Sequence, residues 1–476
     1  MTWDFSDALF ILLIALGSIP ALASVLQYVL AGPHALRDHL DRTAAYLPRV
    51  AILVPAWNEG AVLGPAVRRL LDMDYPDERI RVVVIDDAST DNTPELVGAL
   101  AREHPGRVVH LRREQGGQGK AHTLNAGLEL VLGDDWAQAV LIMDADVVFE
   151  TSALRRMTRH LVDPSVGAVT AYIREGSVPG NWLNRFIAIE YAAAQAVGRR
   201  AQNVLGAMAC LAGGAQLHDR ASLERIGGRI DTSTLAEDTV TTMETQLAGA
   251  RVVFDPHAIV LAEEPAGVNA LWRQRLRWAR GNLQVTGRYR HNWFRRRSAG
   301  PLGGWIFGII WFALLFEPVI ALVCSVGLVT LLVTDADVAW RTFQSLWLLS
   351  FVSVALIVAV TSFADTDTAK RAGAEAVLFP GIGNLFILAV VFSPWLAQQV
   401  EPARLLFYAW PALAMLVVWL ARLVDRPRWR WLSALLVLVG GYGSLLSAVN
   451  VNAYVAQARH QPTTWAKTEK KGMVQG

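Results

Sequence analysis

Long apolar runs stand at both ends of the chain, and they constrain its fold more than any other feature of the sequence. Residues 8–30 hold 23 positions without a formal charge, enough to cross a bilayer with some tilt. Asp4 and Asp7 precede this run, where a signal peptide carries Lys or Arg, so a retained helix is favoured over a cleaved leader. The sequence therefore predicts an N-terminal transmembrane helix within residues 1–33.

Further apolar runs begin after residue 302 and predict a C-terminal α-helical membrane domain over residues 303–457. The runs lie at 303–333, 344–362, 375–399, 404–424 and 431–457. Glu317-Pro318 interrupts the first run, so an interfacial segment at 303–314 is an alternative there to a full span. We expect about four or five spans, followed by a polar tail at 458–476.

Arginine clusters beside two of these runs predict the orientation of the chain. They consist of Arg288, Arg290, Arg295, Arg296 and Arg297 before the first run, and of Arg422, Arg426, Arg428 and Arg430 between the last two. By the positive-inside rule both clusters are cytoplasmic, and so is the globular stretch between the hydrophobic ends. This predicts a multi-pass protein of the plasma (inner) membrane with a cytoplasmic domain. Five C-terminal spans would place the basic tail outside, so we expect one run to differ from a simple span.

The cysteines and the net charge exclude some classes of protein. Cys210 and Cys324 are the only cysteines of the chain, one in the globular stretch and one in an apolar run. A disulfide framework and a cysteine metal site are therefore excluded. The formal net charge of +2 decides nothing alone, and we expect no nucleic-acid partner.

Between the hydrophobic ends, residues 45–260 predict an α/β domain with a Rossmann-like, mostly parallel sheet, because short apolar runs alternate with helix-period segments. The expected strands are 50–55, 80–86, 107–111, 139–144, 166–172 and 251–255. The expected helices are 60–72, 93–103, 120–132, 151–162, 182–197 and 237–248. In such sheets ligands bind beyond the carboxyl ends of the strands, so the polar residues that follow each strand are the candidates for a site.

The strand expected at 139–144 runs directly into Asp144 and Asp146. Burying carboxylates at the end of a strand is costly unless hydrogen bonds or a divalent cation compensate. Mg²⁺ and Mn²⁺ favour oxygen ligands and keep substrate phosphates beside one or two protein carboxylates. On its own, however, the pair is explained more simply as a turn.

The three preceding strands change that assessment. Pro55, Trp57 and Glu59 lie at the end of the first strand, where Trp57 either stacks on a flat base or packs in the core. Asp86 and Asp87 follow the second strand ahead of the helix cap, and we expect them to be free for a uracil imide or ribose hydroxyls. After the third strand, a glycine-rich loop ends at Lys120 and opens a helix, an arrangement that suits phosphate. In this order the strand ends favour a nucleotide-diphosphate site that includes the two aspartates.

Two later segments carry further candidates. Glu237 and Asp238 begin a helix, where acids stabilise the N-terminus, but sugar transfer also needs a carboxylate that takes a proton from the attacking hydroxyl. We favour Asp238 as this base, with Glu237 as its rival. Residues 271–280 form a helix-period segment rich in Arg and Trp, within an amphipathic region predicted at 261–302. This segment suits the membrane interface, and its side chains also suit a diphosphate and a sugar ring.

These residues resemble a known family. Asp87, Asp144-Ala-Asp146, Glu237-Asp238 and the Gln274 to Trp278 segment are similar to the D, DxD, ED and QxxRW set of processive family-2 glycosyltransferases, which include the synthases of cellulose, chitin, hyaluronan and poly-N-acetylglucosamine. The resemblance covers roughly residues 48–290. Ile189-Glu190-Tyr191 and the segment 272–281 look most like the poly-N-acetylglucosamine synthase branch. The resemblance implies a GT-A fold, inverting transfer from a UDP-sugar with Mg²⁺ or Mn²⁺, and membrane helices that form a translocation channel.

The resemblance also implies roles for individual residues. The donor-binding set would be Pro55, Trp57, Glu59, Asp86, Asp87, Lys120, Asp144, Gln274 and Arg277. The metal would be held by Asp146 most directly and by Asp144. Asp238 would be the base, with Glu237 beside it, and the acceptor would contact Trp278, Gly213 and Gly214. The residues of the loop 211–215 are unusually small for that role.

Three functions follow, in decreasing order of expectation. The first is polymerisation of a sugar from a UDP donor into a β-linked polysaccharide that crosses the membrane, with UDP-N-acetylglucosamine favoured and UDP-glucose next. The second is a single transfer to a lipid acceptor. The third is a non-catalytic nucleotide-sugar-binding module that regulates a membrane transporter, against which the intact set of acids argues. Expected partners are the donor, the growing polysaccharide or lipid, the bilayer and an accessory or export subunit.

Overall fold

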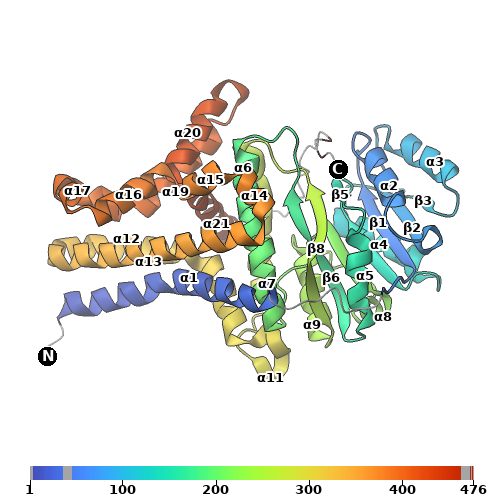
Figure 1. Cartoon of the computed structure of the whole chain (residues 1–476), viewed down its shortest axis with the longest axis horizontal. Helices are drawn as coiled ribbons and strands as arrows, with labels where there is room; N and C mark the ends of the chain where they lie inside the picture. The colour runs from blue at the N-terminus through green and yellow to red at the C-terminus, as the bar shows by residue number, and fades with distance from the viewer. Residues whose placement is uncertain (1–3, 36–44, 462–471, 473, 475–476) are drawn as a thin grey trace. The chain divides into compact units, whose positions relative to one another are not determined.

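The computed structural model of the chain describes residues 4–35 and 45–461, together with residues 472 and 474. These residues fall into two compact units (Figure 1). The α/β unit holds residues 30–264 and 284–307, and the helical unit holds residues up to 29, 265–283 and 308–462. Each unit is described separately below.

The α/β unit is built on one mixed sheet, which has eight strands within the described residues. The strands are β1 (Val50–Ala56), β2 (Ile80–Asp86), β3 (Val108–Arg112), β4 (Ala139–Met143), β5 (Val147–Phe149), β6 (Val166–Glu175), β7 (Ala215–Asp219) and β8 (Arg251–Ala262). Their order across the sheet is β3-β2-β1-β4-β7-β6-β8-β5. β3, β2, β1 and β4 run parallel to one another, and β6 runs parallel to β8.

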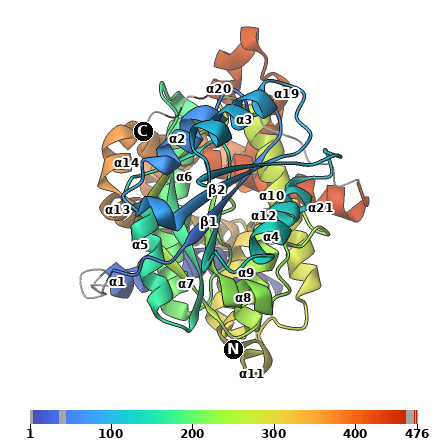
Figure 2. The ribbon, with the colours of Figure 1, turned by 90° about the vertical axis from the view of Figure 1, so that its right-hand side faces the viewer.

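Helices connect these strands, as the alternating pattern predicted (Figure 2). They are α2 (Leu63–Leu71), α3 (Thr93–Glu103), α4 (Lys120–Leu132), α5 (Ala153–Arg159), α6 (Trp182–Tyr191), a π-helical segment (Ala192–Gly198), α7 (Arg199–Leu205), α8 (Arg220–Arg225), α9 (Glu237–Leu247) and α11 (Arg296–Ala299). One face of α4 packs on the sheet through Leu124, Leu128 and Val131, which are buried against apolar residues of β1, β2 and β4. This packing fixes the start of α4, and with it Lys120, near the strand ends.

The six strands expected from the sequence are all present, and two further strands were missed. β7 has buried polar side chains, Gln216 and His218, so its pattern does not resemble a core strand. β5 has only three residues. Because β7 is antiparallel to both β4 and β6, and β5 is antiparallel to β8, the sheet is mixed, and the predicted parallel order is unbroken only from β3 to β4.

The point at which the strand order reverses lies at β1, which has β2 on one side and β4 on the other. In open α/β sheets this position forms a crevice at the carboxyl ends of the strands. The residues that follow β1, β2 and β4 therefore surround one place, and they are the ones selected from the sequence.

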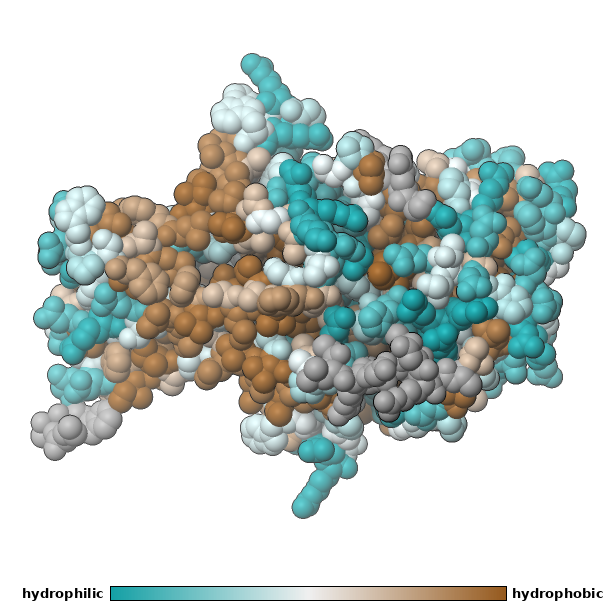
Figure 3. Space-filling model, viewed as in Figure 1, coloured by the Kyte–Doolittle hydropathy of each residue, from teal (hydrophilic) through white to brown (hydrophobic). Residues whose placement is uncertain are grey.

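The helical unit contains the long apolar helices together with shorter or more polar ones. They are α1 (Phe5–Ala35), α10 (Val268–Arg288), α12 (Trp305–Thr334), α13 (Ala336–Ala364), α14 (Thr366–Arg371), α15 (Gly373–Leu378), α16 (Ile382–Phe392), α17 (Pro394–Gln399), α18 (Arg404–Tyr408), α19 (Trp410–Leu423), α20 (Arg430–Gly440) and α21 (Tyr442–Ala458). α1, α10 and α12 each continue into the α/β unit at one end. Apolar residues dominate the visible surface of α12 and α13, whereas polar residues dominate the α/β unit (Figure 3).

Among the described residues, three helices are long and apolar enough to cross a membrane, namely Phe5–His34, Trp305–Thr334 and Ala336–Ala364. Two pairs of helices are each bent at a short break, by 63° at α18–α19 and by 95° at α20–α21, and the number of candidate spans rises to five if each pair counts as one. These helices suggest that the protein associates with a membrane.

The helices decide against one alternative and one expectation about the C-terminal runs. α12 continues through Pro318, so residues 303–314 are not a separate interfacial segment. The run 375–399 is not one span, because it divides into α15, α16 and α17, with Gly381 at a φ of +98° before α16. Ser393 separates the last two helices, because its backbone is extended, with a φ of −114° and a ψ of 107°, and its side chain caps α17.

Small residues allow close packing within the helical unit. Leu13 of α1 lies in a buried cluster with Leu328 and Leu331 of α12 and Phe343 of α13. A β-carbon added at Gly327 would lie 2.4 Å from a methyl group of Leu13. Such contacts bring helix backbones together where apolar surface alone provides little driving force.

Candidate active site

The loops after β1 and β2 are joined by hydrogen bonds. Asn58, which has a φ of +54°, donates its backbone N–H to the Ser89 hydroxyl at 3.0 Å. Its side-chain oxygen accepts the Thr90 N–H at 2.8 Å. Trp57 is 37% exposed beside this joint. Its indole is therefore accessible to a flat base, although stacking on uracil stays a prediction, as do donor contacts by Pro55 and Glu59.

Asp86 is buried at the end of β2, and both of its oxygens are engaged. One accepts the backbone N–H of Ser89 at 2.8 Å, and the other accepts from the Arg112 guanidinium at 2.8 Å. The expectation that this carboxylate is free for a donor is therefore wrong. Its contacts support a structural role at the turn after β2.

Asp87 is also held on both oxygens. Arg113 forms an ion pair with one, and the Gly117 backbone N–H donates to the other at 2.9 Å. A β-carbon at Gly116 would lie 2.0 Å from the Asp87 carbonyl oxygen, so only glycine fits there. The glycine-rich loop thus lies directly on Asp87, and a nucleotide that used this carboxylate would replace one of these partners.

Lys120 joins this loop to the aspartates after β4. Its ammonium pairs with a carboxylate oxygen of Asp144 and donates to the Gly213 carbonyl at 3.0 Å. Burial lowers the pKa of Lys120, but the charge of Asp144, followed by those of Glu237 and Asp238, raises the pKa above its ordinary value overall. Lys120 is therefore a stable cation among three carboxylates.

Two glycines allow this cluster to form. A β-carbon at Gly213 would lie 3.1 Å from Asp238 Oδ2 and 3.5 Å from Lys120 Nζ, and one at Gly214 would lie 3.4 Å from Asp144 Oδ2. The small residues of the loop 211–215 thus have a physical reason, because larger side chains would separate the carboxylates from Lys120. The structure brings together Lys120, Asp144, Asp238 and both glycines, as the sequence predicted.

Asp238 is oriented by the first turn of its own helix. Its Oδ1 accepts the Thr239 backbone N–H at 2.7 Å, while Oδ2 faces Gly213. Oδ2 therefore lies toward the loop proposed to hold the acceptor. This orientation suits a general base, which must reach the proton that it removes.

The chemistry of Asp144 and Asp146 fits a hard divalent cation. The Asp144 side chain is 38% exposed, so its pairing with Lys120 leaves it open to solvent. Within the described residues, no group of three or more His, Cys, Asp or Glu is arranged to hold a metal. Mg²⁺ or Mn²⁺ at this place would therefore depend on one or two carboxylates together with substrate phosphates and water, which is the usual environment of Mg²⁺.

The residues predicted on the Arg- and Trp-rich helix lie on α10, in the part that belongs to the helical unit. The Arg275 guanidinium lies 4.1 Å from the centre of the Trp278 ring and stacks on one of its faces. Roles of Gln274 and Arg277 toward the diphosphate and of Trp278 toward the acceptor stay predictions.

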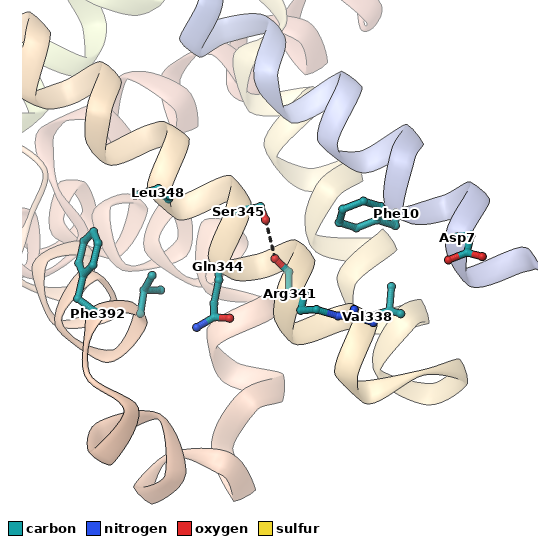
Figure 4. Close-up of a pocket in the computed structure, with 9 residues that line it drawn as sticks. Asp7, Phe10, Val338, Arg341, Gln344, Ser345, Leu348 and Phe392 are labelled. Atoms are coloured by element: carbon teal, nitrogen blue, oxygen red, sulfur yellow. Dashed lines mark hydrogen bonds between the residues drawn. The ribbon is translucent and has the colours of Figure 1, made fainter.

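A pocket in the helical unit is lined by Asp7 and Phe10 of α1, by Val338, Arg341, Gln344, Ser345 and Leu348 of α13, and by Val391 and Phe392 of α16 (Figure 4). Asp7 is the only carboxylate in this lining. The pocket therefore lacks the paired acids that sugar transfer requires, and the strand ends are the better candidate for the active site.

The last turn of α10 lies in the α/β unit and holds the segment that precedes Asp238. Arg288 pairs with Asp231 at 2.9 Å and with Glu244 of α9 at 3.0 Å. The side-chain oxygen of Gln284 accepts the Leu235 N–H at 2.9 Å. These contacts hold the segment 231–235, which precedes α9, at both of its ends.

Replacing Arg288 with Met is expected to loosen this segment. The side chain is 36% exposed, so we expect a loss of only about 1 kcal/mol, or a fall in Tm of roughly 2–4 °C in detergent. Hydrogen bonds from Arg288 and Ser233 outweigh burial and hold the pKa of Asp231 below its ordinary value of 3.8. The stabilisation is therefore complete above that pH and is lost as the pH falls and Asp231 protonates. Arg297→Met, at an exposed position on α11, is the control, and an equal Tm for all three proteins would contradict the role of Arg288.

Comparison with known proteins identifies the domain. Residues 48–281 match the family model described as glycosyltransferase like family 2. These residues form a glycosyltransferase family 2 domain. The family-2 resemblance expected from the D, DxD, ED and QxxRW residues is thereby confirmed.

Curated relatives of the family-2 domain differ in what their names describe. The β-monoglucosyldiacylglycerol synthase of Synechocystis sp. is 31% identical over 263 residues, which cover 55% of this chain and 53% of that protein. The poly-β-1,6-N-acetyl-D-glucosamine synthase of Staphylococcus epidermidis is 28% identical over 237 residues, which cover 50% of this chain and 55% of that protein. The chain thus spans about half the length of these relatives.

A solved structure shares the fold of the family-2 domain. A mannosyltransferase from Pyrobaculum calidifontis, solved in complex with GDP-Man and Mn²⁺, matches with a TM-score of 0.56 at 24% identity, covering 74% of this chain and 97% of that one. The match supports a GT-A-like fold with a mixed sheet.

Sequence reasoning missed several residues that the structure places around the site. Arg112 and Arg113 pair with Asp86 and Asp87; Arg112 is the last residue of β3, and Arg113 follows it directly. Applying the strand-end rule to the residues at 112–113, rather than starting at the glycines, would have found them. Thr242 and Gln246 of α9 contact the loop at Gly213, and no local signal marked them because their partners are about 30 to 40 residues away.

Proposed function

We propose that the protein is a membrane-embedded inverting glycosyltransferase that polymerises sugar from a UDP-sugar donor into a β-linked polysaccharide and passes it across the membrane. The observation that carries the proposal is the cluster of Lys120, Asp144 and Asp238 around Gly213 in a family-2 domain. UDP-N-acetylglucosamine is the favoured donor and UDP-glucose is next. The poly-β-1,6-N-acetyl-D-glucosamine synthases among the relatives support a polymer and the favoured donor.

The chemistry is a single displacement. Asp238 accepts the proton of the acceptor hydroxyl. At the same time the hydroxyl oxygen attacks the anomeric carbon of the donor sugar from the face opposite the diphosphate. The bond from the anomeric carbon to the diphosphate oxygen breaks and UDP leaves, so the configuration at the anomeric carbon is inverted. Lys120 balances the negative charge that accumulates on the leaving group. Asp146 and Asp144 would hold Mg²⁺ or Mn²⁺, which would supply further neutralisation of the diphosphate.

The proposal includes the membrane and the orientation of the chain. The three long apolar helices support a multi-pass arrangement in the plasma (inner) membrane. Arg288, Arg295 and Arg296 precede α12, and this positive charge favours a cytoplasmic family-2 domain, where UDP-sugars are made available.

A second candidate is the transfer of one sugar to a lipid acceptor. The β-monoglucosyldiacylglycerol synthase of Synechocystis sp. is 31% identical over a similar stretch, which favours this alternative. The two candidates share the donor site and differ in the acceptor and in the size of the product.

The test is UDP release by the detergent-solubilised full chain across a panel of UDP-sugars with Mn²⁺ or Mg²⁺. We expect turnover of one donor and its loss on chelation with EDTA, because the phosphates then lose their counter-charge. Restoring Mn²⁺ is expected to restore the rate.

The size of the labelled product separates the two candidates. A high-molecular-weight product that linkage-specific glycosidases digest supports the polymer, whereas a single-sugar glycolipid overturns it in favour of lipid transfer. Binding of nucleotide without UDP release from any donor would contradict both.

A further inference from the structure

The segment formed by residues 208–214, here the acceptor-side loop, has an unusual mode of support. It is irregular and largely buried, and it leads from the region after α7 into β7. Buried backbone groups without a neighbouring strand must find other partners. Here those partners are side chains, and two of them, Thr242 and Gln246, come from α9.

One stripe of α9 faces the acceptor-side loop. Asp238, Thr242 and Gln246 are spaced by four residues, so they lie on the same face of the helix. Gln246 accepts the Met208 N–H at 2.8 Å and donates to the Met208 carbonyl at 2.8 Å. The amide thus pairs with both backbone groups of one residue, as a neighbouring strand would, and it fixes the register of the loop.

Thr242 forms the next contact, one turn closer to Asp238. Its buried hydroxyl donates to the Asp238 carbonyl at 2.6 Å and accepts the Leu211 N–H at 2.8 Å. One hydroxyl therefore links the backbone of the proposed base to the loop. On the other side, the Ala212 N–H donates to the Thr170 hydroxyl of β6 at 2.9 Å.

The loop ends at the catalytic cluster. The carbonyl oxygen of Gly213, one residue beyond Ala212, accepts a hydrogen bond from Lys120. A β-carbon at Gly213 would lie only 3.1 Å from Asp238 Oδ2. A shift of the loop by an ångström therefore changes the separation between Asp238, Lys120 and whatever the loop holds. The Cys210 thiol lies in the same loop, and burial followed by the charge of Asp238 raises its pKa, so it is a neutral group there.

We propose that Thr242 and Gln246 are positioning residues that hold the acceptor-side loop on the helix of the base and so align the acceptor hydroxyl with Asp238. This inference rests on the proposed function. It goes further by assigning the alignment of the acceptor, as distinct from the donor, to the face of α9. The donor site uses the strand ends, so the two steps respond differently to changes on α9.

The test replaces Thr242 with Val, which keeps the shape and removes both hydrogen bonds of the hydroxyl. The full chain is incubated in detergent with Mn²⁺ and the labelled UDP-sugar that the wild type turns over, and label is counted in product and in free sugar. We expect transfer to fall roughly tenfold or more while UDP–Mn²⁺ affinity stays within about twofold. The ratio of donor hydrolysis to transfer should rise, because water replaces a misaligned acceptor. Thr242→Ser should restore transfer to within a few-fold of the wild type.

Thr245→Val is the matched control. Thr245 is buried on the same helix, and its hydroxyl donates to the Thr241 carbonyl at 2.8 Å. The Thr245→Val variant therefore loses a hydrogen bond to the helix backbone like the one that Thr242→Val loses, and we expect it to transfer sugar at the wild-type rate. Gln246→Glu provides a second variant at another position of the same face: it keeps the acceptor for the Met208 N–H and sets a carboxylate oxygen against the Met208 carbonyl.

The outcomes separate this inference from the proposed function. A wild type that turns over a UDP-sugar, together with a Thr242→Val variant that keeps the wild-type ratio of hydrolysis to transfer, overturns the positioning role alone. Equal losses of transfer in Thr242→Val and Thr245→Val also overturn it, because they indicate general destabilisation of α9. A wild type inert toward every UDP-sugar overturns both. If Thr242→Val does not fold, Gln246→Glu decides by the same ratio.

Discussion

Replacing Asp238 with Asn is expected to reduce sugar transfer by about a thousandfold, within the range of roughly 10²–10⁴ that a general base contributes. Asn keeps an oxygen for the Thr239 N–H, which Asp238 Oδ1 accepts at 2.7 Å, so the start of α9 is expected to stay folded. What is lost is the carboxylate on the side of Gly213, and no other group of the residue can take the proton. The measurement is the initial rate of labelled sugar incorporation by the purified full chain.

Binding of UDP with Mn²⁺ serves as the internal control for the Asp238→Asn variant. We expect the affinity to stay within about threefold, because the donor phosphates are assigned to Lys120 and to the aspartates after β4. Glu224→Gln, in an exposed pair on α8, controls for the loss of a carboxylate elsewhere.

Glu237→Gln tests the rival assignment of the base. Glu237 contributes to the charge around Lys120, so a moderate loss of a few-fold is expected. If Glu237→Gln loses transfer a thousandfold while Asp238→Asn keeps more than a tenth of it, the roles of the two acids must be exchanged.

Much of the fold was predictable because it depends on local patterns. The strands from β1 to β4 are short apolar runs between helix-period segments, and each was found from the sequence to within a residue or two. β7 was missed because its partners, β4 and β6, lie far away along the chain and because Gln216 and His218 are buried in it. Burial lowers the pKa of His218 to about 4, so it is neutral and fits the interior, which a residue pattern does not reveal.

In the apolar runs, composition predicted which segments are apolar helices, but not where a helix is interrupted. Hydropathy marked α1, α12 and α13 correctly as long apolar helices. It also merged α15 to α17 into one run, because a window of mean hydropathy does not register the turn at Gly381 or the extended backbone at Ser393. The break of the run 375–399 into three helices agrees with the expectation that one run differs from a simple span.

The candidate site was predictable in its residue types and less so in their pairing. The strand ends selected Lys120 and Asp144, and the pair of acids at a helix start selected Asp238; the structure gathers all three in one cluster. The sequence did not show that Arg112 pairs with Asp86 and Arg113 with Asp87, because the two residues of each pair lie 26 positions apart in the chain. Which carboxylate faces a ligand and which faces a guanidinium is decided by tertiary contacts.

Lys120 is the second residue whose replacement is expected to have a large effect. In Lys120→Met the carboxylates of Asp144, Glu237 and Asp238 lose the cation that lies among them. We expect transfer to fall by roughly 10²–10³-fold, the effect of removing one group that stabilises the charge of a transition state. The KM for the UDP-sugar should rise as well, because Lys120 is assigned to the diphosphate in the ground state.

The contribution of Lys120 to stability depends on its charge, and the pH dependence of the Tm tests this. In the wild type the pKa of Lys120 is raised above 10.5, so its stabilising contribution is complete below that pH and is lost only as the pH rises through the folded value. The Tm difference between the wild type and the variant should therefore persist at neutral pH and shrink above about pH 10.5.

Two variants control for charge and for surface effects in the Lys120 experiment. Lys120→Arg keeps the cation with a different shape, so it should return the KM for the UDP-sugar toward the wild-type value while recovering only part of the rate. Lys370→Met, at an exposed position on α14, should leave the rate and the KM unchanged. An unchanged rate and an unchanged KM in Lys120→Met, alongside a fall in Tm, would mean that Lys120 acts only as a structural link between α4 and the loop at Gly213.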